Sequence, residues 1–280
     1  MNELSLFLQL SVQLGTPFLL GTLGGILCEK VGNLNLGIEG MMILGAFSGF
    51  AAGFHTHSAL LAVLAAMAGG VGGALIYAVI TVTLKGNQTV TGFALTIFGT
   101  GFANFMGKRY SSQIMDSAVT AALGTHSIPG LSKIPVLGTA VFSQSLFVYF
   151  SILVAAALCF YYQKTRFGLA ARMVGESPAT ADASGINVDA CKYVHILIGG
   201  ALCGLGGAYL IVAQLGMFSD NMTAGRGYIA LAAVILGRYC PGGVALASLL
   251  FGVANAAQIR LQALGSALPM QLLAMLPYVV

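Results

Sequence analysis

The chain has 280 residues, of which 58% are hydrophobic and only 7% are charged, and its formal net charge is +4. Soluble domains carry roughly 25% charged residues, so this composition excludes an ordinary soluble domain and indicates a protein of the lipid bilayer. The positive charge is small and dispersed, so nucleic acid is not an expected partner.

Apolar segments recur along the whole chain. A helix that spans a membrane needs about 20 mostly apolar residues. We expect spans at about 5–27, 36–54, 59–84, 89–107, 145–162, 193–214, 228–238, 243–260 and 264–280. The seventh is too short to cross about 30 Å of hydrocarbon, so a half-helix or re-entrant segment is expected there. The sequence thus predicts an all-α polytopic bundle of about eight to ten transmembrane or half-membrane helices, in a single domain over residues 1–280.

Polar residues interrupt the apolar pattern between the first two expected spans. Asn33, Asn35 and Glu39 lie there among glycines. Irregular backbone at membrane depth survives only when it is buried in protein or lines a wet cavity, and an intramembrane acid is costly. The three residues are therefore candidates for a translocation path or its gate. The alternative is an interfacial loop, with Asn35 as the N-cap of the next helix and Glu39 at its positive end.

Two later segments add candidates for the same path. Asn87 and Gln88 open the fourth span with amides that suit a polar solute, although an N-cap by Asn87 explains them almost as well. Asn221, Thr223 and Arg226 precede the short seventh segment. Arg226 has three interpretations, because its side chain could snorkel to the interface, pair with an acid, or hydrogen-bond a solute.

Two longer polar intervals lie outside the expected spans. Residues 108–144 contain proline, glycine and many Ser and Thr residues, so we expect an external loop with a short surface helix. Residues 163–192 concentrate charge and, with Lys85, are expected in the cytoplasm by the positive-inside rule. The N-terminus is then outside. Lys108 and Arg109 also fall outside, against the rule.

The charged interval 163–192 predicts a short helix of its own. Ser177 is its expected N-cap, Pro178 its first residue and Gly185 its C-terminal stop. A short alanine-rich helix flanked by charges fits a groove on a protein partner. A plain interfacial helix is the alternative.

A weak internal repeat is present. Leu23-Gly24-Gly25 recurs as Leu205-Gly206-Gly207, and each copy precedes an Asn-containing loop and a glycine–charge–glycine segment, at 37–40 and at 225–227. The copies would enter the membrane in opposite senses, as in the inverted repeats of many transporters. Chance in a glycine-rich chain is the alternative. Glycines spaced one helical turn apart predict closely packed helices.

Sequence motifs of chemical catalysis are missing. The chain has no Walker A motif, His-Glu-x-x-His pattern, metal-ligand cluster or nucleophile elbow. We therefore expect no enzymatic activity, no metal, no cofactor and no ATP hydrolysis by this chain itself.

Four ordered motifs resemble one family. They are NLGIEGMM at 35–42, NQTVTG at 87–92, the segments 174–178 and 183–187, and MTAGRGYIALAA at 222–233. They are similar to the permease subunits of bacterial nucleoside-type ABC importers, which belong with the ribose-type and branched-chain amino acid permeases. The resemblance covers nearly the whole chain. It implies a multi-pass protein of the bacterial cytoplasmic (inner) membrane that moves nucleosides or similar small polar solutes.

The resemblance also implies partners. These are an ABC ATPase subunit, a second homologous permease subunit and an extracytoplasmic solute-binding protein. The ATPase would receive the region 175–185, so we assign the coupling surface to Arg172, Gly175, Glu176, Pro178, Ala181 and Gly185. The glutamate of the coupling signature in many other ABC permeases is absent, since Ala179-Thr180-Ala181 stands in its place. Relatives usually continue beyond residue 280, which leaves the last span and the C-terminal topology open.

Two alternatives remain at this stage. One is a permease of the same superfamily for a pentose, riboflavin or branched-chain amino acids. The other, from a different class, is a proton-coupled secondary transporter with Glu39 as proton carrier. Such a protein would be expected to use more intramembrane ionisable groups than this chain has.

Overall fold

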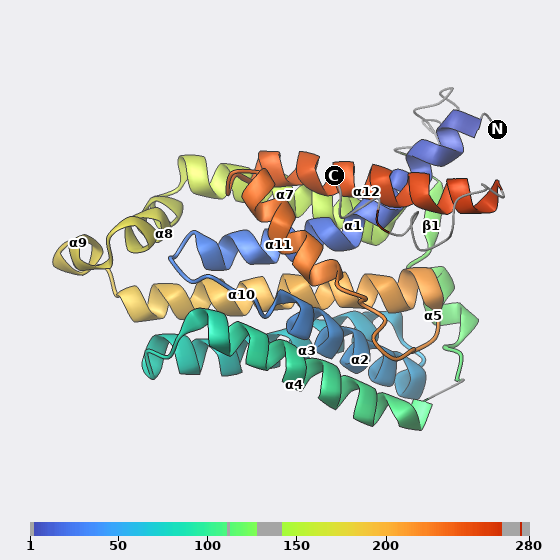
Figure 1. Cartoon of the computed structure of the whole chain (residues 1–280), viewed down its shortest axis with the longest axis horizontal. Coiled ribbons are helices and arrows are strands. Elements are labelled where there is room, and N and C mark those ends of the chain that lie inside the picture. The colour runs from blue at the N-terminus through green and yellow to red at the C-terminus, as the bar shows by residue number, and fades with distance from the viewer. Residues whose placement is uncertain (1–2, 111–112, 128–141, 265–274, 276–280) are drawn as a thin grey trace.

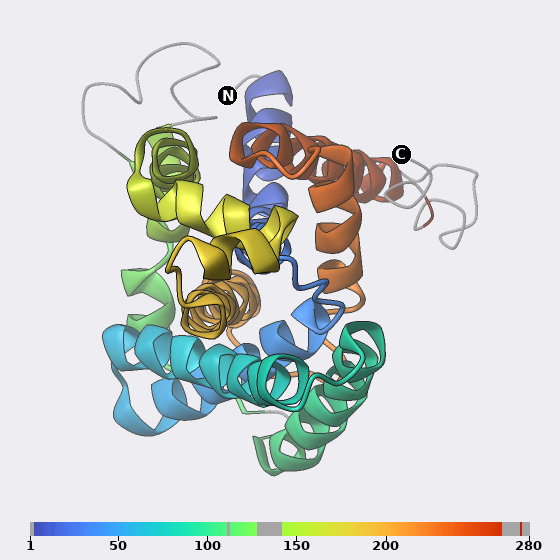
Figure 2. The same ribbon diagram turned by 90° about the vertical axis from the view of Figure 1, so that its left-hand side faces the viewer.

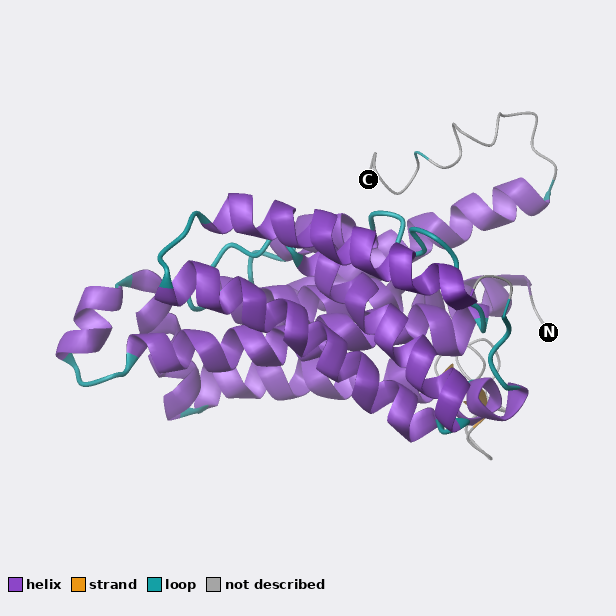
Figure 3. Ribbon diagram, turned by 90° about the horizontal axis from the view of Figure 1, so that it is seen from below, coloured by secondary structure: helices purple, strands orange, loops and turns teal. Residues whose placement is uncertain are grey.

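The computed structural model describes residues 3–110, 113–127, 142–264 and 275, and nearly all of this part is helical (Figure 3). The first half contains α1 (Glu3–Glu29), α2 (Ile38–Thr56), α3 (Ala59–Ala78) with the π-helical turn η1 (Val79–Thr83), α4 (Gln88–Gly107), the 3-10 turn η2 (Lys108–Tyr110) and α5 (Ser117–Ala122). Then come β1 (Thr125–Ser127), β2 (Ser143–Ser145), α7 (Leu146–Lys164), α8 (Arg166–Glu176) and α9 (Pro178–Ala183). The chain continues with α10 (Val188–Ala208), the π-helical segment η4 (Tyr209–Leu215), α11 (Arg226–Leu236) and α12 (Pro241–Ala263).

The expected all-α membrane bundle is confirmed. Within the described residues, six helices are long and apolar enough to cross a membrane: α1, α3 with η1, α4, α7, α10 with η4, and α12. The expected second span is a helix, α2, but it is not among these six. The seventh is α11, whose 11 residues extend about 16 Å, half of the hydrocarbon thickness. The expected ninth span, 264–280, lies almost entirely outside the described residues.

The long helices form a buried centre and a lipid-facing periphery. The most apolar stretches of α1 and α10 are each 83% buried inside the protein, whereas those of α3 and α7 are each 28% buried. Large apolar side chains on the outer helices are exposed accordingly, among them Leu60, Ile97, Leu153 and Leu246. Because lipid tails are as apolar as these side chains, their exposure is favourable only in a membrane.

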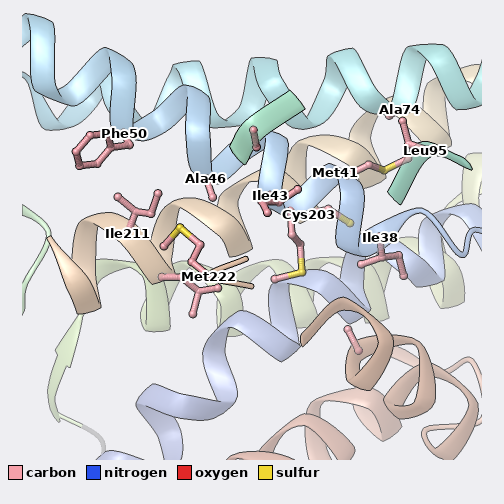
Figure 4. Packing of buried hydrophobic residues seen from close by; sticks show 14 of the residues in the cluster. Ile38, Met41, Ile43, Ala46, Phe50, Ala74, Leu95, Cys203, Ile211 and Met222 are labelled. Carbon is pink, nitrogen blue, oxygen red and sulfur yellow. The ribbon is translucent and has the colours of Figure 1, made fainter. Parts of the chain in front are cut away.

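Small residues bring the central helices into close contact. A Cβ atom added to Gly45 of α2 would lie 2.3 Å from Gly204 Cα of α10 and 2.9 Å from the Ala66 oxygen of α3. Figure 4 shows the side chains of Met41, Ile43 and Ala46 between neighbouring helices in this core. The glycine spacing therefore predicted the packing correctly, since only glycine permits this approach of two backbones.

The polar intervals lie at opposite ends of the bundle. α8 and α9 cover one end, beside the turns that join α1 to α2 and α3 to α4 (Figures 1 and 2). At the other end lie α5, which confirms the short helix expected in 108–144, and an antiparallel pair of strands, β1 and β2, that the sequence did not predict. Lys30 and Lys85 follow the ends of α1 and η1 on the α9 side, and Lys192 lies near the start of α10. These positions agree with the orientation that the positive-inside rule predicts, in which the α9 end would face the cytoplasm.

We expect Gly45→Ala to lower the free energy of unfolding of the detergent-solubilised protein by about 1–3 kcal/mol, because the new methyl group would overlap the α10 backbone. Gly72→Ala on α3 is the matched control, since a Cβ there meets no atom within 4 Å. Unfolding titrations should separate the two variants. Equal stability of both would contradict the packing argument.

Candidate translocation site

Two irregular segments enter the bundle from opposite ends and meet inside it. Residues 30–37 lead from the C-terminal end of α1 to α2, and Gly40 of α2 packs on the backbone of Leu95 and Thr96. These lie seven and eight residues into α4, or about 10 Å from its start. Residues 216–225 descend from the other end, where the Phe218 ring packs against Gly107. Both α2 and α11 therefore begin at membrane depth.

The Glu39 carboxylate joins the two segments. Its side chain is only 3% exposed. Oε1 accepts a hydrogen bond from Gly225 N at 2.8 Å, and Oε2 accepts one from Gly227 N at 2.5 Å. A Cβ on Gly227 would lie 2.5 Å from Glu39 Cα, and Gly225 has a φ of +80°. The glycine–charge–glycine sequence at 225–227 thus allows the α11 backbone to reach the carboxylate.

This contact satisfies two positive helix ends with one negative charge. The first amides of a helix have no partner within it, and the helix N-terminus carries a partial positive charge. Glu39 lies in the first turn of α2 while it accepts bonds from the first turn of α11. Its expected place at a positive helix end is confirmed, and the bond to a second helix end is new.

The two asparagines of the first segment are buried in protein. Asn33 and Asn35 are each 1% exposed. Asn33 Nδ2 donates to Thr81 Oγ1 at 3.3 Å, while its Oδ1 has no hydrogen-bond partner among the described residues. Asn35 Oδ1 accepts from Gly37 N at 2.9 Å. The expectation that Asn35 is the N-cap of α2 is wrong, because Gly37 occupies that position without a side-chain cap.

The pair at the start of α4 lies at the α9 end of the bundle. Asn87 Oδ1 accepts from Val90 N at 3.1 Å, so the N-cap interpretation of Asn87 is confirmed. Gln88 binds the first segment on both sides: its Oε1 accepts from Leu34 N at 2.8 Å and its Nε2 donates to Gly32 O at 3.3 Å. These amides therefore hold the inner end of the 30–37 segment.

The second segment contains the remaining three path candidates. The Arg226 guanidinium is half-buried and donates from Nη1 to the carbonyl oxygens of Met222, at 3.0 Å, and Thr223, at 3.2 Å. These two bonds hold the guanidinium against its own loop. Thr223 is fully buried, and its Oγ1 has no partner in the described part of the chain. Asn221 is exposed, and its backbone N donates to Asn104 Oδ1 at 3.2 Å.

An exposed aromatic pair beside Glu39 escaped the sequence analysis. Tyr228 of α11 is 40% exposed and Phe93 of α4 is 46% exposed, and their ring centroids are 6.4 Å apart. Tyr228 follows Gly227, whose amide binds Glu39. In sequence, aromatic residues in apolar segments look alike, so only the position of Tyr228 next to the glycine–charge–glycine segment could have marked it.

The helix expected in the charged interval is present. α9 begins at Pro178, and its N-cap Ser177 accepts a hydrogen bond from Thr180 N at 3.4 Å. Gly185 has a φ of +80°, which suits a helix stop. Beside α9 lies an open groove of about 600 Å³, whose lining includes Pro178, Ala179, Asp182, Gly185, Asn187 and Asp189.

The six residues assigned to coupling fall into different environments. Glu176, Pro178 and Gly185 are exposed, and Arg172 is half-buried. Gly175 packs against the turn after α1, where a Cβ would lie 2.3 Å from the Lys30 oxygen. Ala181 is fully buried. The assignment of Ala181 to a docking surface is therefore wrong, because its methyl group packs inside this chain with side chains such as Val174.

The two halves of the weak repeat run in opposite senses. α1 leads toward the α9 end and α10 leads away from it (Figure 1). The helices touch at small residues, since a Cβ on Gly24 would lie 2.5 Å from the Gly199 oxygen. The two glycine–charge–glycine segments are in direct contact through Glu39.

Comparisons with known proteins agree with this geometry. Residues 8–279 match the family described as the permease component of branched-chain amino acid transport systems. The guanosine ABC transporter permease protein NupQ of Bacillus subtilis is 35% identical, covering 95% of this chain and 85% of NupQ. The nucleoside ABC transporter permease protein NupC of Lactococcus lactis is 36% identical, covering 99% of this chain and 90% of NupC.

Two further proteins complete the comparison. TsgC13 of Haloferax volcanii, provisionally described as a glucose ABC transporter permease protein, is 35% identical over 93% of this chain and 79% of its own length. A solved structure in an inward-facing conformation, provisionally described as a metal-chelate type ABC transporter, shares the fold. Its TM-score is 0.54 at 14% identity, covering 96% of this chain and 81% of that one.

We expect Glu39→Ala to lower the free energy of unfolding by about 2 kcal/mol or more, because it leaves two buried amides without an acceptor. Glu39→Gln keeps one carbonyl acceptor, so its free energy of unfolding should lie between those of Glu39→Ala and the wild type. Unfolding in mixed micelles measures both.

The control is Asp220→Ala, an exposed acid within the second segment, which should leave stability unchanged. A purely proton-carrying Glu39 would give a different pattern. Its Gln variant would then unfold like the wild type and lose transport as completely as the Ala variant, and this result would contradict the role of Glu39 as a helix cap.

Proposed function

Because the chain belongs to the family of permease components of branched-chain amino acid transport systems and is the permease subunit of an ATP-binding cassette importer, we propose that its solutes are nucleosides. It is a multi-pass protein of the cytoplasmic membrane and not an enzyme. As in other permeases of this kind, an ATPase and a substrate-binding component work with it. Family membership favours this activity over a proton-coupled secondary transporter.

The contact that carries the mechanism is the meeting of the two half-membrane segments at Glu39. A site at which two helices begin inside the membrane is where transporters place the solute, since free amides and polar loops are available there. Glu39, Asn33 and Asn35 are buried. They therefore shape the site and do not form its open surface, whereas Asn221, Arg226 and Tyr228 lie at least partly open.

The open face between α4 and α11 suits a nucleoside. Phe93 and Tyr228 present ring surface at the depth of Glu39. Stacking of an aromatic ring on a nucleobase contributes about 1–3 kcal/mol of binding free energy per base. We place the path along this face, with the second, homologous permease subunit closing it from the other side. A hexose is the second candidate solute because of the likeness to TsgC13.

Coupling to the ATPase is assigned to the exposed edge of α8 and α9. Glu176 and Pro178 are exposed there, and Asp182 lines the adjacent groove. From this edge a chain of contacts leads inward, since Gly175 packs on Gly32 and Gln88 binds both Gly32 and Leu34. A displacement of α8 therefore acts directly on the 30–37 segment, which leads to Glu39 in the first turn of α2. The single domain over 1–280 would move as the unit between the ATPase and an extracytoplasmic solute-binding protein.

We expect Tyr228→Ala to reduce uptake of labelled guanosine by about tenfold at low concentration, because the nucleobase loses its stacking surface. Tyr228→Phe should retain uptake. Leu153→Ala, an exposed position on α7 with no ring contact, is the control. Competition of the wild-type uptake by unlabelled nucleosides but not by glucose should accompany this result. Competition by glucose but not by nucleosides would contradict the proposal and would identify a hexose as the solute.

We expect the double substitution Glu176→Arg and Asp182→Arg to reduce ATP-driven uptake by about tenfold or more, because charge reversal at a docking surface opposes binding of the partner. Copurification of the ATPase subunit should fall in parallel. The matched control is the charge reversal Lys108→Glu with Arg109→Glu, at two exposed positions in η2 that follow the end of α4. Normal uptake and copurification in the Glu176 and Asp182 variant would remove the coupling role from this edge.

A further inference from the structure

An apolar groove opens sideways near the α9 end of the bundle, away from the path and next to the coupling edge. It has a volume of about 750 Å³ and lies between α7, α8 and α10. Leu158 and Phe160 of α7, Phe167 of α8, and Val194 and Ile198 of α10 line it. Phe160 and Phe167 are 64% and 76% exposed, so the groove opens on the outer face of a lipid-facing helix.

The polar groups in the groove wall are already paired with each other. His195 is bonded to the Cys191 carbonyl through Nδ1, at 2.7 Å, and to the Tyr161 hydroxyl through Nε2, at 3.1 Å. A carbonyl only accepts, so the Nδ1–H form is present and Nε2 accepts from Tyr161. Thr165 likewise donates to the Tyr161 carbonyl and accepts from Gly168 N. These pairs leave an apolar occupant as the best fit.

The dimensions of the groove match one leaflet of the bilayer. Along α7 its lining runs from Ala157 to Thr165, and along α10 from Ala190 to Ile198. Each stretch extends about 12 Å, whereas one leaflet contributes about 15 Å of hydrocarbon. A groove of this length that opens at the membrane surface would end within one leaflet, as an acyl chain does.

The mouth of the groove is positively charged. Lys164 and Arg166 are exposed and flank the lining residue Thr165, and half-buried Lys192 follows the lining residue Cys191. Asp189 is the acid next to this rim, and it lines the separate groove beside α9. Basic residues at the cytoplasmic ends of membrane helices attract anionic lipid headgroups. We propose that this groove binds one anionic phospholipid of the inner leaflet, with an acyl chain in the groove and the phosphate at Lys164 and Arg166.

The test is native mass spectrometry of the assembled transporter, titrated with phosphatidylglycerol or with phosphatidylcholine. The variant Ala157→Trp fills the groove from an exposed lining position, and Ala156→Trp is its control on the same helix outside the lining. We expect the first to lose phosphatidylglycerol and the second to retain it. Equal retention by both would overturn the proposal.

A second pair of variants tests the charged mouth. We expect Lys164→Gln with Arg166→Gln to weaken phosphatidylglycerol binding by about fivefold for each charge, while phosphatidylcholine binding is unchanged. The control is Lys108→Gln with Arg109→Gln, two residues that follow the C-terminal end of α4, away from the groove. If both double variants weakened phosphatidylglycerol binding equally, Lys164 and Arg166 would have no specific role in binding the phosphate. A different result would overturn the whole proposal. The transporter would retain no phospholipid, and the variant Ala157→Cys would crosslink to a partner subunit, which shows that protein fills the groove.

Discussion

The architecture depends on one buried carboxylate that binds the start of a second helix. Two breaks in the backbone at membrane depth leave helix amides that water cannot reach, and such groups are costly in lipid. Glu39 begins one half-membrane helix and accepts from the first amides of the other, Gly225 and Gly227. This bond lets the chain maintain irregular segments in the middle of the bundle, where a solute can be recognised. The glycines around it serve the same contact.

The rest of the bundle is arranged around this junction. α1 and α10 are buried and cross at glycines, while α3, α4, α7 and α12 shield them from lipid. α8 touches the first irregular segment through Gly175 and Gly32, and Gln88 holds the same segment from α4. A permease must transmit movement from a soluble partner to the membrane centre. Here the distance is bridged by direct contacts of packed backbone, which resist compression.

Lipid exposure explains features that have no role in the path. The outer helices carry large apolar side chains on open faces, and α8 exposes Phe167 beside Arg166. The groove between α7, α8 and α10 belongs to this outer layer. Its position close to α9 means that a phospholipid bound there would contact the region assigned to coupling. The lipid composition of the inner leaflet would then act on the coupling region, although no lipid enters the solute path.

The sequence by itself determined the class and the order of the elements. Charge scarcity and apolar segment length are properties of the chain alone, so the membrane bundle, the short seventh helix and α9 with its Ser177 cap were predictable. Tertiary structure decided the roles of single residues. Sequence spacing placed Ala181 and Arg226 in functional segments, but it could not show that Ala181 faces the interior or that Arg226 binds its own loop. The partnership of Glu39 with α11 joins residues 186 and 188 positions apart, and only the packing of whole helices brings such residues together.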